Sequence, residues 1–325
     1  MLCLGGTLDP KKVKGKIFVC LRGITARLDK GQQAALAGAV GMILCNDKAS
    51  GNELMADFHV LPASNINYED GVAVFAYVNS TDDPMGFITA PAAELNTKPA
   101  PFMASFSSQG PNVITPQILE PDITAPGVNI IAAYTQARSP TDRSYDRRRT
   151  PFITESGTSM ACPHVAGVVG LLKTLYPDWS SAAIKSAIMT TARTRDNTVN
   201  PMRNGSLIKV TPFDYGAGHI RPNRTMDPGL IYDLSVTVTR RLKNVGSPAG
   251  ATYALCIREP VGISVSVEPN ILKFKKIGEE KSLKVTLEAK RLGAAMDYVF
   301  GGLIWSDGKH YVRSPIVVSS AAAAP

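Results

Sequence analysis

The segment 163–175 limits the fold of this 325-residue chain more than any other. It is apolar on nearly every side of a helical wheel, and two of its residues are glycines that allow close contacts. This pattern predicts a helix buried on several sides. The helix should end just before Pro177, because proline disfavours a helical residue before it. A second helix is predicted over 182–192, with Ser180 or Ser181 as its cap.

The rest of the chain divides into regions of different pattern. Residues 1–100 read as a small mixed α/β unit, with predicted strands at 13–20 and 42–45 and predicted helices at 30–40 and 71–78. Residues 101–235 are rich in proline-containing turns and include the predicted buried helix. Residues 236–320 form a third region, whose apolar residues alternate with polar ones up to residue 318.

The alternation in the third region is typical of strands with one buried face. One face is predicted to carry Ile263, Val265 and Val267, and another to carry Leu283, Val285 and Leu287. Asp307-Gly308 lies between two apolar runs, which is a strong signal for a hairpin turn. The natural interpretation is a β-sandwich.

Composition excludes several classes of function. Hydrophobic residues make up 44% and charged residues 19%, so a globular core is expected. The net charge is +8, but the basic run 147–149 has no interleaved aromatic residues and no nucleic-acid motif is present. Nucleic acid is therefore not expected as a partner, whereas acidic partners stay open. No apolar stretch is long enough to span a membrane. The five cysteines lack a CxxC spacing, so a zinc site is not predicted. No motif in the sequence points to another metal or to a cofactor.

Ser159 is the candidate catalytic residue. It follows Gly157-Thr158 at the start of the predicted buried helix. Backbone N–H groups at a helix N-terminus lack intrahelical partners and can stabilise a developing oxyanion. On local pattern alone, a simple helix cap at Ser159 is the better interpretation, since capping serines are common.

A longer string changes that balance. Gly157-Thr158-Ser159-Met160-Ala161-Cys162-Pro163-His164-Val165-Ala166-Gly167 closely resembles the serine motif of subtilisin-like proteases. The blocks 104–111 and 121–130 resemble the family's segments before the serine. The blocks 215–219 and 227–233 resemble its plant branch in particular.

The resemblance implies a multidomain α/β plus β protein. Residues 1–100 would be a protease-associated domain, shortened at its start. Residues 101–235 would be the C-terminal part of a subtilisin-like α/β catalytic domain, with a parallel sheet and a buried helix after the serine. Residues 236–320 would be a fibronectin-III-like domain lacking its first strand, because the comparison with the family predicts a deletion after Leu234 that removes the end of the catalytic domain and the start of the sandwich.

The implied activity is serine endopeptidase action on protein or peptide substrates through an acyl-enzyme on Ser159. Thr158, Ser105 and Gly110 would lie at the oxyanion hole or the substrate cleft. The family's aspartate and histidine motifs do not occur in this sequence. The four histidines, His59, His164, His219 and His310, do not resemble the family's catalytic histidine. The chain alone is therefore expected to be inert and poorly soluble, with part of the apolar helix facing water. The alternative is a non-catalytic peptide- or protein-binding pseudoprotease.

The resemblance also bears on modification, location and assembly. It implies a disulfide between Cys3 and Cys20, whereas Cys45 and Cys162 are expected to be buried free thiols. Glycosylation sequons begin at Asn79, Asn204 and Asn223. They agree with the extracellular location, in the apoplast or cell wall, that the family implies, although no signal peptide is recognised in this chain. A homodimer through the protease-associated domain is also implied.

Overall fold

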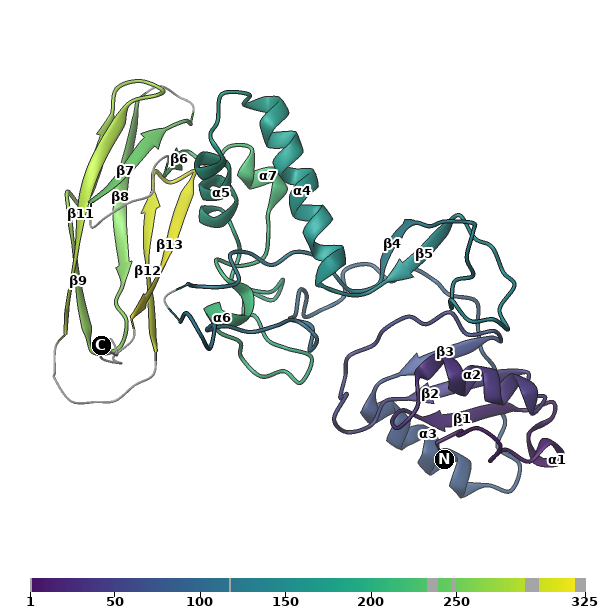
Figure 1. The fold of residues 1–325 in the computed structure, drawn as a ribbon. Helices are drawn as coiled ribbons and strands as arrows, with labels where there is room; N and C mark the ends of the chain where they lie inside the picture. Colours follow the sequence, from purple (N-terminus) through teal and green to yellow (C-terminus); the bar gives the residue numbers. More distant parts are fainter. Residues whose placement is uncertain (1, 117, 233–238, 247–249, 290–297, 319–325) are drawn as a thin grey trace. The chain divides into compact units, whose positions relative to one another are not determined.

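The computed structural model describes every residue except 1, 117, 233–238, 247–249, 290–297 and 319–325 (Figure 1). The chain forms two compact units, each drawn from several stretches of sequence. The first contains Met1–Ser107, Pro126–Met160 and Arg203–Lys209. The second contains Ser108–Ala125, Ala161–Met202 and Val210–Pro325.

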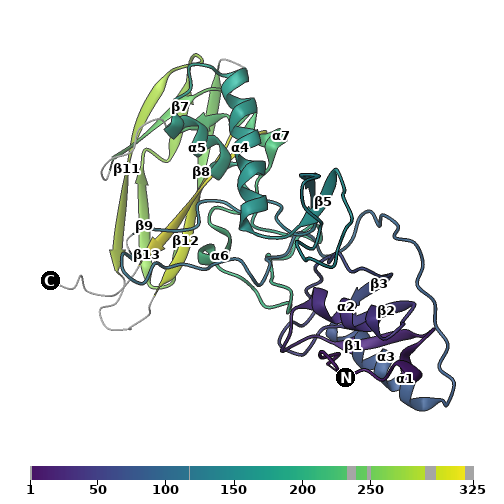
Figure 2. The same cartoon turned by 45° about the vertical axis from the view of Figure 1, so that its right-hand side comes forward.

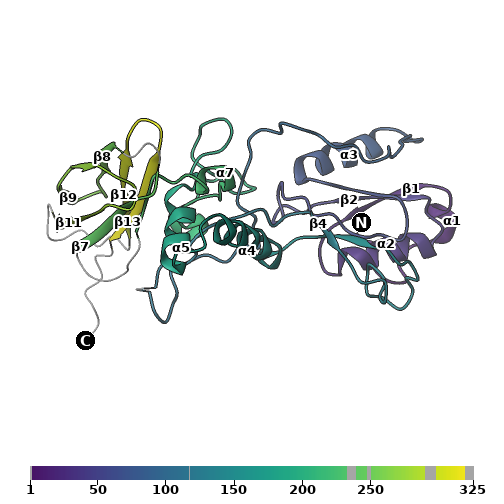
Figure 3. The same ribbon diagram turned by 90° about the horizontal axis from the view of Figure 1, so that it is seen from above.

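The first unit begins with a three-stranded parallel sheet in the order β1-β2-β3. Its elements are α1 (Pro10–Val13), β1 (Ile17–Leu21), α2 (Arg27–Leu36), β2 (Gly41–Cys45), β3 (Ala63–Ile66) and α3 (Tyr68–Ser80). Parallel strands need a crossover connection, and α2 supplies it between β1 and β2. Figure 3 shows α2 and α3 on opposite faces of this sheet. The mixed α/β unit predicted from the sequence is thus present.

The predicted helices and strands of this region are shifted at their ends. The strand predicted from residue 13 begins only at Ile17, because α1 occupies residues 10–13 and begins at an Asp9 cap with a proline in its first turn. The helix predicted over 71–78 begins earlier, at Tyr68, because the Asn67 side chain accepts a hydrogen bond from the Asp70 N–H.

A short antiparallel ribbon follows within the same unit. Strand β4 (Ile130–Ala133) pairs with β5 (Phe152–Glu155), and the long loop between them brings the chain back in the opposite direction. The resemblance implied a parallel sheet in this region. Among the described residues, this two-stranded ribbon is instead the sheet next to the serine, and the parallel ladder of the chain is the one formed by β1, β2 and β3.

Helix α4 (Thr158–Leu175) is exposed along most of its length, which agrees with the expectation that part of its apolar surface faces water in this chain alone. Leu172 alone is fully buried, against Ile184 and Ile188 of α5 (Ser181–Thr190). The side chain of Leu171, next along the helix, is 61% exposed. The elements that pack on α4 within the second unit cover one side of it, and the apolar residues of the other side face solvent.

Other expectations for the second unit are confirmed. Helix α5 corresponds to the helix predicted over 182–192. Its cap is Ser180, whose Oγ accepts a hydrogen bond from the Ala183 N–H at 3.0 Å. Two short helices follow, α6 (Pro212–Tyr215) and α7 (Pro222–Thr225).

The sandwich consists of two four-stranded sheets (Figure 2). One has the order β10-β8-β12-β13 and the other β6-β7-β11-β9. The strands are β6 (Leu230–Ile231), β7 (Thr239–Asn244), β8 (Ala251–Arg258), β9 (Ile263–Glu268), β10 (Ile271–Phe274), β11 (Glu280–Ala289), β12 (Val299–Ser306) and β13 (Tyr311–Val318). Strand β6 lies upstream of the boundary predicted at residue 236.

The structure confirms the predicted buried face of the sandwich strands and the predicted hairpin turn. Trp305, Tyr253, Leu283 and other side chains from both sheets form one buried cluster. Asp307-Gly308 joins β12 to β13 as predicted, with Gly308 at a positive φ of 89° that favours glycine. Leu287 departs from the predicted pattern, because its side chain is exposed whereas Leu283 is buried.

Candidate active site

Ser159 lies in the first turn of α4, directly after a strand and a tight turn. Strand β5 ends at Glu155, and α4 begins at Thr158. The Gly157 N–H donates to the Gly127 carbonyl at 2.8 Å, which holds the turn against the segment that enters β4. The serine is thus presented at the end of a short ribbon.

A second contact fixes the same turn. The Ser156 hydroxyl accepts a hydrogen bond from the Asn129 N–H at 2.8 Å and donates to the Asn129 side-chain oxygen at 3.2 Å. Asn129 adopts a positive φ of 53°, a conformation that asparagine tolerates better than most residues. Asn129 therefore positions the turn before the nucleophile. Sequence reasoning missed this role, and the asparagine within block 121–130 was its one local signal.

The chemistry available at Ser159 follows from its exposure and its place in the helix. Thr158 and Ser159 are both exposed, so a substrate can reach the hydroxyl. The Met160 N–H donates to the Gly157 carbonyl at 3.0 Å. The N–H groups of Thr158 and Ser159 have no carbonyl one turn earlier in the helix to bond, and they carry the positive end of the helix dipole. An oxyanion formed by attack of Ser159 on a carbonyl would find donors there.

Among the described residues, no histidine lies in position to act as a general base for Ser159. None of the four histidines is hydrogen-bonded to its hydroxyl in that part of the chain. His59 is buried in the protease-associated region, and burial lowers the pKa of its ring. The ring of His219 contacts the Ile220 carbonyl, and burial also lowers its pKa. His310 lies in the sandwich between two carboxylates.

The remaining predicted cleft residues have structural roles. The Ser105 N–H donates to the Glu53 carboxylate at 3.0 Å, and Ser105 itself is exposed. Gly110 belongs to the second compact unit, where its N–H donates to the Phe213 carbonyl at 3.0 Å. A β-carbon at Gly110 would lie 2.3 Å from the Glu120 carbonyl oxygen, so close packing requires glycine there.

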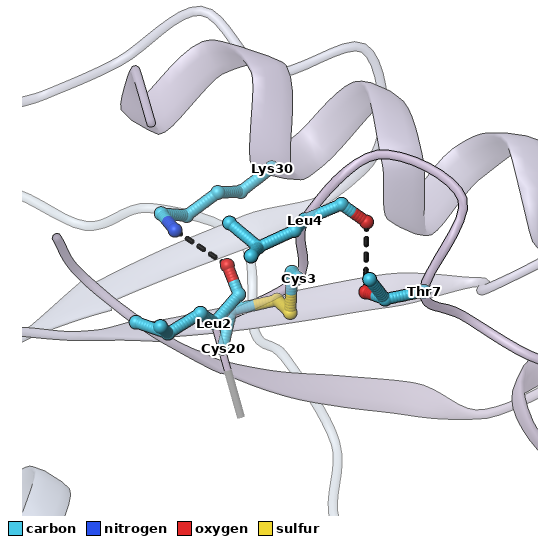
Figure 4. The surroundings of a disulfide bond; sticks show 6 residues. All are labelled: Leu2, Cys3, Leu4, Thr7, Cys20 and Lys30. Carbon is cyan, nitrogen blue, oxygen red and sulfur yellow. Dashed lines mark hydrogen bonds between the residues drawn. A yellow bond between two sulfur atoms is a disulfide. The ribbon is translucent and has the colours of Figure 1, made fainter. Parts of the chain in front are cut away.

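Cys3 and Cys20 form a disulfide whose sulfur atoms are 2.00 Å apart (Figure 4). The bond ties the N-terminal segment to β1, and the buried Lys30 ammonium donates to the Leu2 carbonyl beside it. Cys45 is a buried free thiol, as expected. Cys162 is free but exposed, which corrects the expectation that it is buried, because it lies on the uncovered side of α4.

The three sequon asparagines differ in their surroundings. Asn79, at the end of α3, and Asn223, in α7, are exposed. Asn204 is half-buried, and its side-chain oxygen accepts hydrogen bonds from the Ser206 and Ile208 N–H groups, both at 3.0 Å. Access therefore favours Asn79 and Asn223 for attachment of a glycan.

Within the described ranges, no cluster of three or more metal-ligating side chains is present. The helices of those ranges also include none long and apolar enough to cross a membrane.

Family models match three parts of the chain. The model of the subtilase family matches residues 46–218, that of the PA domain matches 3–74 and that of a fibronectin type-III domain matches 230–318. The first of these covers more than half of the sequence. The chain belongs to the subtilase family.

The individual relatives are plant proteins. Subtilisin-like protease SBT5.4 of Arabidopsis thaliana is 57% identical over 98% of this chain and 47% of its own length. SBT5.3 of the same plant is 46% identical over 98% of this chain and 48% of its own length. A subtilisin-like protease of Glycine max, Glyma18g48580, is 41% identical over 98% and 48%. The chain thus spans about half the length of the curated relatives it matches.

The alignment with SBT5.4 also contains gaps. It runs over 369 positions, which exceeds the 325 residues of this chain by 44, so at least 44 aligned positions have no counterpart here. This agrees with an internal deletion such as the one predicted after Leu234.

Proposed function

We propose that this chain carries the nucleophile of a serine endopeptidase, with Ser159 forming the acyl-enzyme. The observation that carries the proposal is the placement of an exposed serine in the first turn of α4, directly after a strand and a fixed glycine turn. The serine hydroxyl would attack the peptide carbonyl and pass its proton to a base. The Ser159 N–H would help to stabilise the resulting oxyanion.

The base and the orienting aspartate must come from polypeptide that this sequence does not supply. The chain by itself is therefore proposed to be catalytically inert. In serine proteases that have lost a catalytic residue, substrate binding and the oxyanion hole alone accelerate the reaction roughly 10³–10⁴-fold over the rate in water. This acceleration is negligible for peptide hydrolysis. Thr158 is proposed as a further substrate contact, because its side chain is exposed next to the nucleophile.

The experiment compares this chain with a fusion to the family's segment that carries the aspartate and histidine motifs. The fusion should react with a fluorophosphonate probe and hydrolyse casein, and Ser159→Ala should abolish both, since loss of one member of such a catalytic set costs roughly 10⁶ in rate. Ser282→Ala, which changes an exposed serine of β11 in the sandwich and leaves the nucleophile and its turn intact, is the matched control. Equal activity in the fusion and its Ser159→Ala variant would refute the assignment.

Protein or peptide substrates follow from this activity. Secretion to the plant cell exterior is proposed from the family, with the exposed Asn79 and Asn223 sequons as support. A homodimer through the protease-associated region is also proposed from the family. Sedimentation of the fusion, with and without the first hundred residues, would test it.

A further inference from the structure

One sheet of the sandwich carries arginines on the face that is turned away from the core. Trp305 of β12 belongs to the core cluster, so the neighbouring Ile304 points to the opposite face. Ile304 is paired with Arg313 of β13, and Gly302 is paired with Arg258 of β8. Directly paired residues share a face, so both arginines lie on the outer face, and Gly302 has no side chain to separate them.

The outer face meets the segment that follows α5. Helix α5 packs beside β13 (Figure 1). The Arg313 guanidinium donates through Nη1 to the Thr194 hydroxyl at 3.1 Å. Thr194 stands between Arg193 and Arg195, whose guanidinium groups donate to the Asp196 and Val199 carbonyls of the loop that follows.

Two further arginines come from α7 and its cap. Arg221 is the residue before α7, and Arg224 lies within the helix. The backbone of Arg193 pairs with that of His219, two residues before Arg221, and this bridge joins the segments. We call the six residues Arg193, Arg195, Arg221, Arg224, Arg258 and Arg313 the arginine cluster.

The members of the arginine cluster act on one another electrostatically. Burial lowers the pKa of Arg313, and the positive charges of Arg221 and Arg258 lower it further. Burial likewise lowers the pKa of Arg221, and the positive charges of Arg224 and Arg193 lower it further. Guanidinium groups stay protonated at neutral pH, so these effects express repulsion.

Within the described ranges, the ion pairs of the chain involve none of the six arginines. The Asp196 carboxylate, next to Arg195, accepts hydrogen bonds from Thr198 and Asn200 within its own loop. A concentration of like charge favours the binding of an anion.

We propose that the arginine cluster is a binding site for a small multivalent oxyanion, a phosphate or a carboxylate. Arginine is suited to this chemistry, because its planar fork binds the two oxygens of such groups with parallel hydrogen bonds. An anion with two or more charges can contact guanidinium groups from the sheet and from the α5–α7 segments together. The site does not involve Ser159, and its test is independent of proteolytic activity.

The test is calorimetric titration of the full chain with pyrophosphate and, separately, with citrate. Arg221→Gln and Arg258→Gln remove exposed members of the cluster, and each should weaken binding about tenfold or more, because hydrogen bonds between charged partners are the strong ones. The matched control is Arg241→Gln, an exposed arginine of β7 that pairs with Glu280 outside the cluster. It should leave the affinity unchanged.

Circular dichroism checks that each variant is folded, and the use of exposed arginines avoids the partly buried Arg313, whose loss could disturb the sheet. Binding of pyrophosphate alone assigns a phosphate ligand, and binding of citrate alone assigns a carboxylate. Absence of binding of both at millimolar concentration overturns the proposal. So does an equal loss of affinity in the Arg241→Gln control, because the attraction would then be that of a basic chain in general.

Discussion

Replacing His310 with glutamine should weaken the contact between the turn 227–229 and the β12–β13 hairpin. The His310 ring contacts Asp307 through Nδ1 at 2.8 Å and Asp227 through Nε2 at 3.0 Å. The histidine side chain is 3% exposed, whereas those of Asp307 and Asp227 are 14% and 47% exposed. The glutamine side chain cannot carry the charge or reach both carboxylates.

The two contacts should contribute unequally to the free energy of unfolding. A buried hydrogen bond between charged partners is worth about 1.5–3 kcal/mol, and the contact with Asp307 belongs to this class. Asp227 is half-exposed and also has the Lys309 ammonium at 3.5 Å, so its contact should give less than about 1 kcal/mol. His310→Gln should therefore cost about 2–3 kcal/mol, and Asp307→Asn should cost more than Asp227→Asn.

The stabilisation by this cluster should depend on pH. Burial lowers the pKa of His310, but the two carboxylates outweigh burial and the pKa is raised. Its contribution is then complete below the unfolded pKa of about 6.5 and is lost as the pH rises through the folded value. For Asp307, burial raises the pKa, but the bond from His310 outweighs it and the pKa is lowered. Its contribution is present above about pH 3.9 and is lost as the pH falls through the folded value.

The assay is urea unfolding of the full chain, followed by the fluorescence of the fully buried Trp305 in a Trp179→Phe background. The wild type should lose stability between pH 5.5 and pH 8.5, and His310→Gln should lose much less over the same interval. Burial and the neighbouring Asp307 raise the pKa of Tyr253, so its ring stays neutral in this range. The reasoning fails if both proteins show the same pH dependence, or if Asp227→Asn costs as much as Asp307→Asn.

Three smaller perturbations test the packing of the N-terminal region. A β-carbon at Gly71 would lie 2.9 Å from the Cys45 β-carbon, so Gly71→Ala should cost about 1–3 kcal/mol in chemical denaturation, whereas Gly86→Ala, which meets nothing within 4 Å, should be neutral. Cys3→Ser opens the disulfide and should lower the free energy of unfolding of the oxidised chain by about 3 kcal/mol. Burial raises the pKa of Cys45 to about 11, so a maleimide at pH 7 should label the exposed Cys162 and leave Cys45 unmodified in the native chain.

The elements set by local chemistry could be predicted from sequence. Ser180 caps α5 because its hydroxyl is one residue before the helix, and Asp307-Gly308 turns because glycine accepts the positive φ required there. Which side of α4 is covered could not be predicted in the same way. A helical wheel shows which side chains are apolar, but coverage depends on which other segments pack against them.

In the candidate site, too, features within one continuous string could be predicted, whereas contacts between distant residues could not. Ser159 was recognisable because the whole of its motif lies in one continuous string. The contact of Asn129 with Ser156 joins residues 27 positions apart, and that of Asp227 with His310 joins residues 83 positions apart. Neither pair is marked by spacing or by periodicity, so a structure was needed to bring them together. The arginine cluster was invisible for the same reason, because its members come from four separate segments.

The uncovered apolar side of α4 indicates a missing packing partner, and Ser159 at the start of this helix also lacks a general base. Leu171 and Leu175 are 61% and 54% exposed, and β-carbons at Gly167 and Gly170 would meet nothing within 4 Å. An apolar face of this kind is typical of a surface that another polypeptide covers. Since SBT5.4 is more than twice as long as its aligned part, the family's remaining half is the natural candidate to cover the helix that Ser159 begins. If one segment supplies both the cover and the base, solubility and fluorophosphonate reactivity should appear together when it is joined to this chain. A fusion that gains solubility but leaves Ser159 unreactive would separate the two and favour a non-catalytic role.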